Sequence, residues 1–353
     1  MGSRLAVICS YRLGMHDGVS VEAAKWARAL VRLGFDVRTV AGAGRADVVL
    51  PGLDLGGTAP PSPAALDDAF AGAEVVVVEN LCSLPLNPAA GAAVADALAG
   101  RPAVLHHHDL ALERPELAHL GPPPDDPTWA HVCPSERAAH LLAEHGIEAT
   151  VVRNAFDPRP PAGDRAATRD LLDVAPDEPL VLQPTRAILR KGVPEGLRLA
   201  ERLGATYWLT GAVEEGYGND LEAILAGART RVLHRPAPGE GEAAMAGAYA
   251  ACDLVVLPSR LEGFGNPALE AAVHRRPLAV GRYGVADELR ALGFCWFDLD
   301  DVSAMEAFLD HPDAGLLAGN AALAAEHCSL DDLPGRLHGV LGRPAAAALG
   351  SGP

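Results

Sequence analysis

The stretch DLVVLPSRLEGFGNPALEA, Asp253 to Ala271, joins a continuous apolar run to a glycine-containing turn and then to alanine- and leucine-rich chain. A short apolar run bounded by turn residues predicts a buried strand of a parallel sheet. Asparagine followed by proline predicts a helix start, with Asn266 as the cap and Pro267 in the first helical position. The stretch therefore predicts strand, turn and helix, the repeating unit of a doubly wound α/β fold.

The rest of the chain repeats this alternation of apolar runs with alanine-rich segments of helical period. VSVEAAKWARALVRLGF, for example, places Val19, Trp26 and Leu30 on one helical face, and leaves Lys25 on a face that we expect to be solvated. Strands alternating with such helices predict parallel sheets covered on both faces. The expected strands lie within 5–10, 36–42, 47–50, 74–80, 103–108, 130–135, 150–156, 179–185, 206–212, 231–237, 253–259, 277–283 and 294–300.

A chain of 353 residues exceeds one ordinary core, so we expect two Rossmann-like domains that face a central cleft. The proline-rich segment FDPRPPAGDRAATRD, Phe156 to Asp170, is the expected linker. Ligands of such sheets bind beyond the carboxyl ends of the strands. The expected parts are an N-terminal domain (1–157), a C-terminal domain (158–328), a helix crossing back (329–342) and a disordered tail (343–353).

The totals exclude several classes of protein. A net charge of −17 offers no basic field for nucleic acid or for an anionic membrane. The six cysteines contain no CxxC pair, which fits a reducing cytoplasm. We find no signal peptide and no apolar stretch of membrane-spanning length, so we expect a cytoplasmic protein without a transmembrane segment.

Glu262 and Glu270 flank the predicted helix start at Asn266. A helix N-terminus attracts anions, and Gly263 and Gly265 would let a ligand approach the backbone amides. Carboxylates accept hydrogen bonds from hydroxyls, so the pattern suits a phosphate between two hydroxyl-rich groups, as in a nucleotide sugar. An ordinary strand–turn–helix with a solvated glutamate fits the local pattern equally well.

Two cations, Arg186 and Lys191, follow the expected strand 179–185 in the segment TRAILRKG. They stand five positions apart in one loop, so both could converge on one diphosphate, with arginine binding through its forked guanidinium and lysine as a point charge. Arg190 between them is expected to be a surface cation. The alternative is that all three cations are solvated.

A cluster of histidines, His106 to His108, followed by Asp109, stands at the carboxyl end of another expected strand. Adjacent side chains alternate in direction, so at most two of the three histidines point one way. This is poor geometry for a three-histidine zinc site, and no metal is expected. Recognition of sugar hydroxyls is the functional interpretation, and solvated loop histidines are the alternative.

At these residues the chain resembles the retaining GT-B glycosyltransferases of family GT4. Glu262 to Glu270 reproduces the family's E-x7-E pattern as EGFGNPALE, and Arg186 with Lys191 stands where the family has its two cations. The segments VENLCSLPLNP and HHHDLALER resemble a subgroup that includes sugar–glycerate-type glycosyltransferases. The resemblance spans roughly residues 5 to 340 and is more specific in the second domain.

The resemblance implies roles for these residues. Arg186 and Lys191 would neutralise the donor diphosphate, Glu262 would hold the donor sugar, and Glu270 would accept from the ribose hydroxyls. His108, with His106 and His107 as alternatives, would contact the sugar near its 6-hydroxyl. Further implied donor-binding residues are Gly18, Gly263, Phe264, Gly265, Asn266, His234 and Arg235, and the acceptor-side candidates are His107, Asp109 and Glu113.

Two departures from the family pattern stand out: Asp17-Gly18 replaces a Gly-Gly pair, and Asn266-Pro267 replaces apolar residues. The implied reaction moves a hexose-type sugar from a UDP- or GDP-type sugar, base unresolved, to a small soluble hydroxyl acceptor, of secondary-metabolite or sugar-acid type. It proceeds by same-face displacement with no metal or cofactor. The alternatives are a nucleotide-sugar epimerase, a phosphorylase or a non-catalytic nucleotide-sugar-binding protein. Ser20 is expected to cap the first helix.

Overall fold

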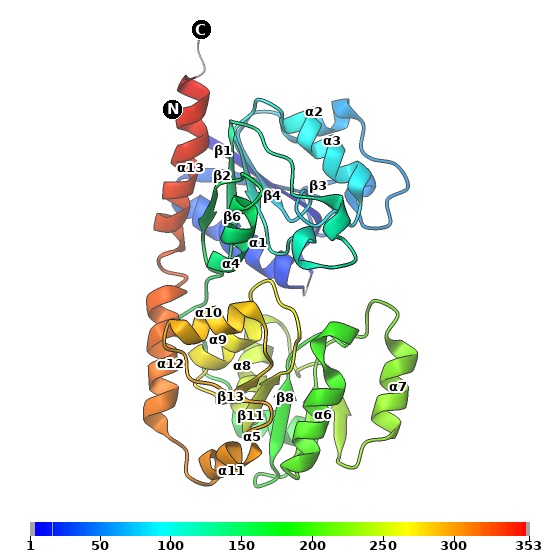
Figure 1. Ribbon diagram of the computed structural model, residues 1–353, viewed down its shortest axis with the longest axis vertical. Helices are drawn as coiled ribbons and strands as arrows, with labels where there is room; N and C mark the ends of the chain where they lie inside the picture. The colour runs from blue at the N-terminus through cyan, green and yellow to red at the C-terminus, as the bar shows by residue number, and fades with distance from the viewer. Residues whose placement is uncertain (1–3, 16, 351–353) are drawn as a thin grey trace. The chain divides into compact units, whose positions relative to one another are not determined.

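The computed structural model describes residues 4–15 and 17–350 of the 353-residue chain. These residues form two compact α/β units (Figure 1). Unit 1 comprises Met1–Ala155 together with Leu330–Pro353, and unit 2 is Phe156–Ser329. Each unit contains one sheet, and every neighbouring pair of strands in the described sheets is parallel. The expectation of two parallel-sheet α/β domains is confirmed.

The sheet of unit 1 has seven strands among the described residues, in the order β3-β2-β1-β4-β5-β6-β7. Each strand overlaps one of the apolar runs in the sequence, because continuous β-branched runs suit strands that are buried on both faces. The strands are β1 (Arg4–Leu13), β2 (Phe35–Gly44), β3 (Val48–Val49), β4 (Ala73–Glu79), β5 (Ala103–His106), β6 (Trp129–Cys133) and β7 (Ala149–Val151).

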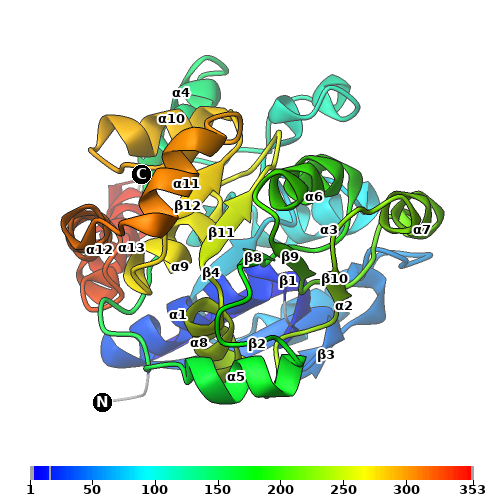
Figure 2. The ribbon, with the colours of Figure 1, turned by 90° about the horizontal axis from the view of Figure 1, so that it is seen from below.

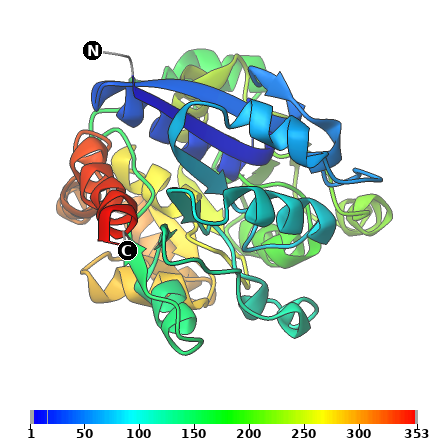
Figure 3. The same cartoon turned by 90° about the horizontal axis from the view of Figure 1, so that it is seen from above.

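Helices cover both faces of this sheet. Ile8 of β1 belongs to a core with Trp26 of α1 and Leu337 of α13, whereas its neighbour Val7 packs on the other side with Val94 of α3. Alternate residues of one strand therefore feed the two cores. α13, the red helix of Figure 3, packs against α1 and β6. The helices are α1 (Gly18–Arg32), α2 (Pro63–Ala69), α3 (Pro88–Leu98), α4 (Glu136–Ala143) and α13 (Leu333–Gly350), with 3₁₀ turns at Pro51–Leu53, Ala111–Glu113 and Ala118–Leu120.

The sheet of unit 2 has six strands among the described residues, in the order β10-β9-β8-β11-β12-β13. Their order reverses at β8, whose two neighbours are β9 and β11. This reversal matters because ligands of doubly wound sheets bind at the carboxyl ends of the strands where the order reverses. The strands are β8 (Leu180–Gln183), β9 (Thr206–Leu209), β10 (Val232–His234), β11 (Leu254–Leu257), β12 (Leu278–Val280) and β13 (Phe297–Asp298).

Helices also cover both faces of the second sheet. Val181 of β8 packs with α6, α7 and α11 on one face, and Leu182 packs with α5, α8 and α9 on the other (Figure 2). A 3₁₀ turn at Leu189–Lys191 precedes α6. The helices are α5 (Arg165–Leu172), α6 (Val193–Arg202), α7 (Gly218–Ala226), α8 (Gly241–Ala251), α9 (Asn266–Val273), α10 (Gly284–Ala291), α11 (Val302–Asp310) and α12 (Ala314–His327).

The structure differs from the expected organisation in two segments. The predicted linker, 156–170, contains the start of α5, because Asp164 caps that helix and Arg169 is buried among backbone carbonyls of unit 2. The predicted unstructured tail, 343–353, is helical as far as Gly350, where α13 ends, and 351–353 lie outside the described residues. Phe156 pairs with Ser329 where the chain enters and leaves unit 2. None of the helices in the described part of the chain has the length and apolar character needed to span a membrane.

Candidate functional site

The predicted cations of unit 2 lie in the loop that follows β8, at the point where the strand order reverses. Gln183, the last residue of β8, is fully buried and its side-chain amide donates to the Lys191 carbonyl at 3.0 Å and to Thr185 Oγ1 at 3.0 Å. The side-chain carbonyl oxygen of Gln183 accepts a hydrogen bond from the Tyr207 hydroxyl at 2.6 Å. A buried amide with both ends satisfied holds the cation loop in one conformation.

Lys191 and Glu262 form a buried ion pair across the reversal point. Lys191 Nζ lies 2.5 Å and 2.7 Å from the two carboxylate oxygens of Glu262, which follows β11. Arg190 adds a weaker contact at 3.6 Å and donates to the Leu261 carbonyl at 3.1 Å, so it is not the simple surface cation that we expected. Burial lowers the pKa of Lys191, and Glu262 opposes that shift. Two residues that are distant in sequence thus meet, as a common ligand site requires.

Arg186, the other predicted diphosphate cation, pairs with a residue that the sequence analysis did not identify. Its Nη1 lies 2.7 Å from Glu214 Oε2. Glu214 follows β9, and its loop is tied to that of Arg186 by a backbone bridge between Ala187 and Val213. A glutamate in a loop gives no sequence signal of its own, because its significance comes from the strand order that places β9 beside β8.

The helix start at 266 differs in detail from the prediction. Gly265, and not Asn266, is the N-cap of α9, and Asn266 is the first helical residue, with Pro267 in the first turn. Gly265 has φ +90°, in the left-handed region, and a Cβ placed on it would lie 2.4 Å from the Tyr283 hydroxyl. The turn therefore requires glycine for conformation and for space. Gly263 and Phe264 complete the turn, with Phe264 buried in the core.

Two hydroxyls near this turn are buried without a hydrogen-bond partner among the residues that the structure describes. They belong to Ser259, just after β11, and to Tyr283, just after β12. Burial and the nearby carboxylate of Glu262 raise the pKa of Tyr283 well above its usual range, so this hydroxyl keeps its proton. Sequence reasoning missed both residues, because a serine and a tyrosine at strand ends are common in any α/β fold.

Glu270 lies inside α9, one turn beyond the cap, as predicted. Its Oε2 accepts from the Tyr249 hydroxyl at 2.6 Å, and the Tyr249 ring stacks on His274 with centroids 4.8 Å apart. Glu262 and Glu270 therefore have different neighbours and do not face each other as an acid/base pair. Two further donor-binding candidates are exposed: His234, the last residue of β10, and Arg235, which follows it. The His234 ring bonds to the Gly211 carbonyl at 3.0 Å.

Gly192 makes the cation loop possible, and its replacement by alanine tests the loop's geometry. Its φ is +64°, and a Cβ would lie 2.4 Å from the Pro258 carbonyl oxygen. Gly204 has a similar φ of +61° with nothing within 4 Å of its Cβ, so Gly204→Ala isolates the conformational cost, about 1–2 kcal/mol. We expect Gly192→Ala to lower the urea midpoint of unfolding clearly more than Gly204→Ala. Equal shifts would show that the loop relaxes without cost.

The predicted histidine cluster of unit 1 lies at the carboxyl end of β5, beside Glu79 at the end of the neighbouring strand β4. His108 Nε2 and His106 Nδ1 lie 2.6 Å and 2.8 Å from the same oxygen, Glu79 Oε2. Burial would raise the pKa of Glu79, but the two imidazoles outweigh it and lower the pKa to about 2. Burial would lower the pKa of His108, and Glu79 instead raises it above its usual value. His106 stacks on Trp26 with ring centroids 4.1 Å apart.

His107 points away from this cluster, as the alternation of adjacent side chains requires. Its Nε2 lies 2.9 Å from His131 Nδ1, and His131 in turn lies 3.1 Å from Asp125. Burial, aided by His131, lowers the pKa of His107 well below its usual value. His107 was an acceptor-side candidate, and the structure places it in the interior, 1% exposed, on a different hydrogen-bond chain from His106 and His108.

Glu79, His106 and His108 are also three buried groups whose donor atoms lie within 4.8 Å of one another, close enough to consider a metal ion. However, the two nitrogen–oxygen distances of 2.6 Å and 2.8 Å are hydrogen-bond lengths. Ligands spread tetrahedrally around zinc at about 2.0–2.2 Å stand further apart than this. Glu79 therefore bonds to His108, and His106 Nδ1 lies close to the same carboxylate oxygen without hydrogen-bond geometry.

The other acceptor-side candidates lie on the turn after β5. Arg114 Nη2 forms an ion pair with Asp109 Oδ1 at 3.5 Å. The backbone N–H of Asp109 donates to Asn80 Oδ1 at 3.0 Å. Glu113 lies 3.3 Å from Arg137, and burial raises the pKa of Glu113 despite that arginine. Each of these two carboxylates therefore lies beside a guanidinium group, one from the turn and one from α4, a composition that suits hydroxyls and carboxylates of a polar ligand.

The first helix of unit 1 corrects two expectations. Asp17, and not Ser20, is the N-cap of α1, accepting from the Ser20 amide at 3.0 Å, and Gly18 is the first helical residue. Lys25 is not on a solvated face. It is buried and its Nζ lies 2.8 Å from Glu22, which is 0% exposed. A charged pair at i and i+3 looks like a surface pair in sequence, and burial is decided by packing.

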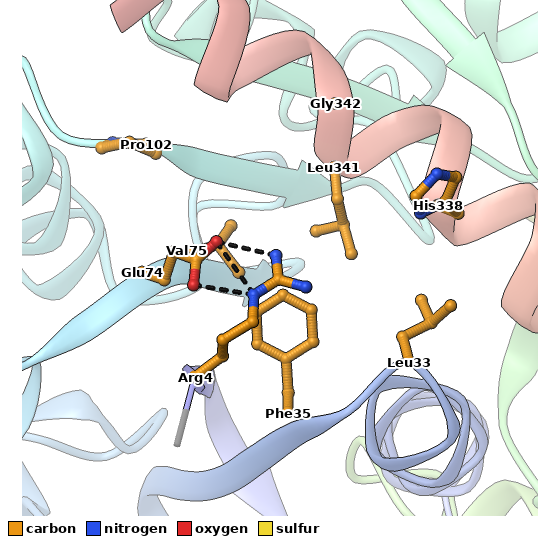
Figure 4. Close-up of a pocket in the computed structure, with 9 residues that line it drawn as sticks. All are labelled: Arg4, Leu33, Phe35, Glu74, Val75, Pro102, His338, Leu341 and Gly342. Carbon is orange, nitrogen blue, oxygen red and sulfur yellow. Dashed lines mark hydrogen bonds and ion pairs between the residues drawn. The ribbon is translucent and has the colours of Figure 1, made fainter. Parts of the chain in front are cut away.

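A hollow in unit 1, whose lining residues are drawn in Figure 4, lies at the amino ends of the strands, whereas His106 to His108 lie at the carboxyl ends. Arg4 and Glu74, near the beginnings of β1 and β4, form a bidentate pair with distances of 2.7–3.2 Å, and Arg4 lies 4.0 Å above the Phe35 ring. Leu341 of α13 closes the side of the hollow. Because it stands at the amino ends of the strands, this hollow does not belong to the predicted site.

Part of this chain matches a known protein family. Residues 189–309, which include Lys191, Glu262 and Glu270, match the family described as Glycosyl transferases group 1. The mannosylglucosylglycerate synthase of Thermotoga maritima is 26% identical over 364 aligned positions, which cover 82% of this chain and 84% of that protein. The protein of the same name from Petrotoga mobilis is 26% identical over 271 positions, or 63% of this chain and 62% of that protein.

Solved structures show the same fold. HepE from Anabaena, in complex with UDP-glucose, superposes with a TM-score of 0.73 at 18% identity, covering 96% of this chain and 99% of that one. Sucrose-phosphate synthase from Thermosynechococcus elongatus gives a TM-score of 0.74 at 14% identity, with 98% and 100% covered. At such identities the likeness establishes the fold, and that fold is GT-B.

Proposed function

From the premise that this chain is a glycosyltransferase, with a GT4-type glycosyl transferases group 1 domain on a GT-B fold, we propose that it moves a hexose-type sugar. The donor is a nucleotide-diphosphate sugar, and the acceptor is a small hydroxyl-bearing molecule. The observation that carries this proposal is the Lys191–Glu262 pair at the reversal point of the second sheet, with Arg186 close enough to lower the pKa of Lys191 by charge repulsion.

The cations serve the leaving group. When the bond between the sugar and the diphosphate breaks, negative charge develops on the distal phosphate. Lys191, largely buried, and Arg186 stabilise that charge with little reorganisation, because their loop is already fixed by Gln183. The backbone amides at the start of α9 add partial positive charge. These groups make the departure of the nucleoside diphosphate independent of a metal ion in our proposal.

The carboxylates serve the two hydroxyl-rich ends. Glu262 accepts from the donor sugar, and Glu270, positioned by Tyr249, accepts from the ribose. Because each glutamate has its own partner, neither is assigned as nucleophile or general base. Transfer then proceeds on one face of the sugar, with the leaving phosphate oxygen taking the proton of the acceptor hydroxyl, and the anomeric configuration is retained.

We propose that unit 1 binds the acceptor. The proposed acceptor is a small sugar-acid or a related secondary metabolite, supported by the relationship to synthases named for a glycerate product and by the arginine–carboxylate turn after β5. His108, held by Glu79 with a raised pKa, is proposed to reach a sugar hydroxyl as a charged donor. Its role and those of His107, Asp109, Glu113 and Gly18 remain predictions.

Donor binding is the first test. Thermal unfolding of the wild-type protein should be followed with UDP-, GDP- and ADP-linked glucose and mannose, in buffer with EDTA. One class of donor should stabilise the protein by about 2.7 kcal/mol at a concentration 100 times its dissociation constant. A protein that unfolds at the same temperature with every nucleotide sugar, with and without Mg²⁺, would contradict the proposal.

A further inference from the structure

Both cations proposed to bind the donor diphosphate are already occupied by carboxylates of the protein. Lys191 is held by Glu262 at 2.5 Å and 2.7 Å, and Arg186 is held by Glu214 at 2.7 Å. Arg190 also lies 3.6 Å from Glu262, so a second cation accompanies the Lys191–Glu262 pair, whereas Arg186 and Glu214 form a pair of opposite charges. An anion that takes the Arg186 donor now held by Glu214 must displace that carboxylate.

Backbone contacts between two loops fix the position of Glu214. The Ala187 amide donates to the Ala212 carbonyl at 2.9 Å, and the Glu214 amide donates to the Ala187 carbonyl at 3.3 Å. Gly211 approaches so closely that a Cβ on it would lie 2.2 Å from the Thr185 carbonyl oxygen. These backbone contacts fix the loop after β9 against the loop after β8. Glu214 thus stands beside Arg186 because of the backbone, and not through a chance encounter of two long side chains.

The two ion pairs differ in how easily they are displaced. Lys191 and Glu262 are 11% and 7% exposed, whereas Arg186 and Glu214 are 32% and 37% exposed. A half-exposed pair is weak because water and salt screen it. A diphosphate carries more charge and more acceptor oxygens than one carboxylate, so it can replace Glu214 on the guanidinium. A monoanion lacks this advantage.

We propose that Glu214 is a specificity-determining residue that occupies Arg186 in the empty donor site and is displaced by a diphosphate. This inference rests on the proposed function, because it assigns the same site to a nucleoside diphosphate. Glu214 lowers the affinity of the site for all anions. Weakly charged ligands are excluded by this lower affinity, whereas the diphosphate still binds.

The test is the affinity of Glu214→Gln for nucleoside diphosphate, measured by calorimetry with UDP and GDP in EDTA. Glutamine keeps the shape and removes the charge, so the variant should bind the diphosphate about two- to fivefold more tightly than the wild type, the range expected for loss of a half-exposed ion pair. The difference should shrink in 0.5 M salt because of screening. Glu214→Ala should show the same direction of change.

Glu201→Gln is the matched control. Glu201 also pairs with an arginine of unit 2, Arg229, at 3.0 Å. The substitution Glu201→Gln therefore removes the same charge at another place in the unit. Its diphosphate affinity should equal that of the wild type. Unchanged or weaker binding by Glu214→Gln, or weaker binding by Glu214→Ala, overturns the inference and makes Glu214 a support for Arg186. Failure of the folded wild type to bind either diphosphate would instead refute the proposed function.

Discussion

Replacement of Lys191 by alanine is expected to lower kcat/KM for sugar transfer by about 10²- to 10³-fold, the usual effect of removing one group that stabilises a developing negative charge. Lys191 is the cation nearest to Glu262 and is buried beside the start of α9. Its loss removes a charge from the leaving-group site and leaves Glu262 buried, with Arg190 at 3.6 Å. Steady-state transfer assays on the folded variant measure the effect.

The chain offers a close control for this experiment. Lys25 and Lys191 are its two lysines, and both are buried in a pair with a glutamate. Lys25→Ala should therefore destabilise the protein, since breaking a buried pair costs about 3–5 kcal/mol. Its affinity for nucleoside diphosphate should stay within about twofold of the wild type, because distant sites act independently. Equal loss of diphosphate binding in both variants would show that the effect of Lys191 is structural.

Replacement of Glu262 by glutamine is the second large effect. We expect kcat/KM with the nucleotide sugar to fall about 10- to 100-fold, because a hydrogen bond from a sugar hydroxyl to a charged acceptor is lost. The affinity for nucleoside diphosphate without sugar should not fall, since the substitution releases Lys191. Calorimetry with the diphosphate and kinetics with the sugar nucleotide separate the two ends of the donor.

Glu270→Gln is the companion variant for that experiment. Glu270 is assigned to the ribose, so this variant should weaken the binding of the nucleoside diphosphate and of the nucleotide sugar by the same factor. Equal weakening of the diphosphate by Glu262→Gln and Glu270→Gln would contradict the assignment of the two glutamates to different ends. Tyr249→Phe should act in the same direction as Glu270→Gln, because the Tyr249 hydroxyl positions that carboxylate.

The sheets could be predicted from the sequence because local composition decides them. Runs such as LAVIC at 5–9 and LVVL at 254–257 can be buried on both faces only in a parallel sheet, and their turns mark where each strand ends. The same reasoning located Arg186, Lys191, Glu262 and Glu270, because each follows a predicted strand or opens a predicted helix. The structure adds that these ends meet where the strand order reverses.

The residues that could not be predicted depend on contacts between distant segments. Glu214 is significant because β9 lies beside β8, and Lys25 is buried because Glu22 and the core of unit 1 enclose it. The cap at Gly265 was misplaced by one residue because a left-handed glycine can end a turn as well as asparagine. The continued helix beyond Gly342 contains alanines that suit a helix, and the sequence reading gave its glycines and proline more weight.

The proposed reaction is retaining sugar transfer from a nucleotide-diphosphate sugar. Proton NMR of the wild-type protein, mixed in EDTA with UDP- or GDP-linked glucose or mannose and a panel of sugar-acid acceptors, tests it most directly. We predict that the donor's anomeric signal decays while a product signal of the same anomeric configuration grows. A product of opposite configuration would contradict the retaining mechanism, and a donor that stays intact with every acceptor would contradict the proposed transfer.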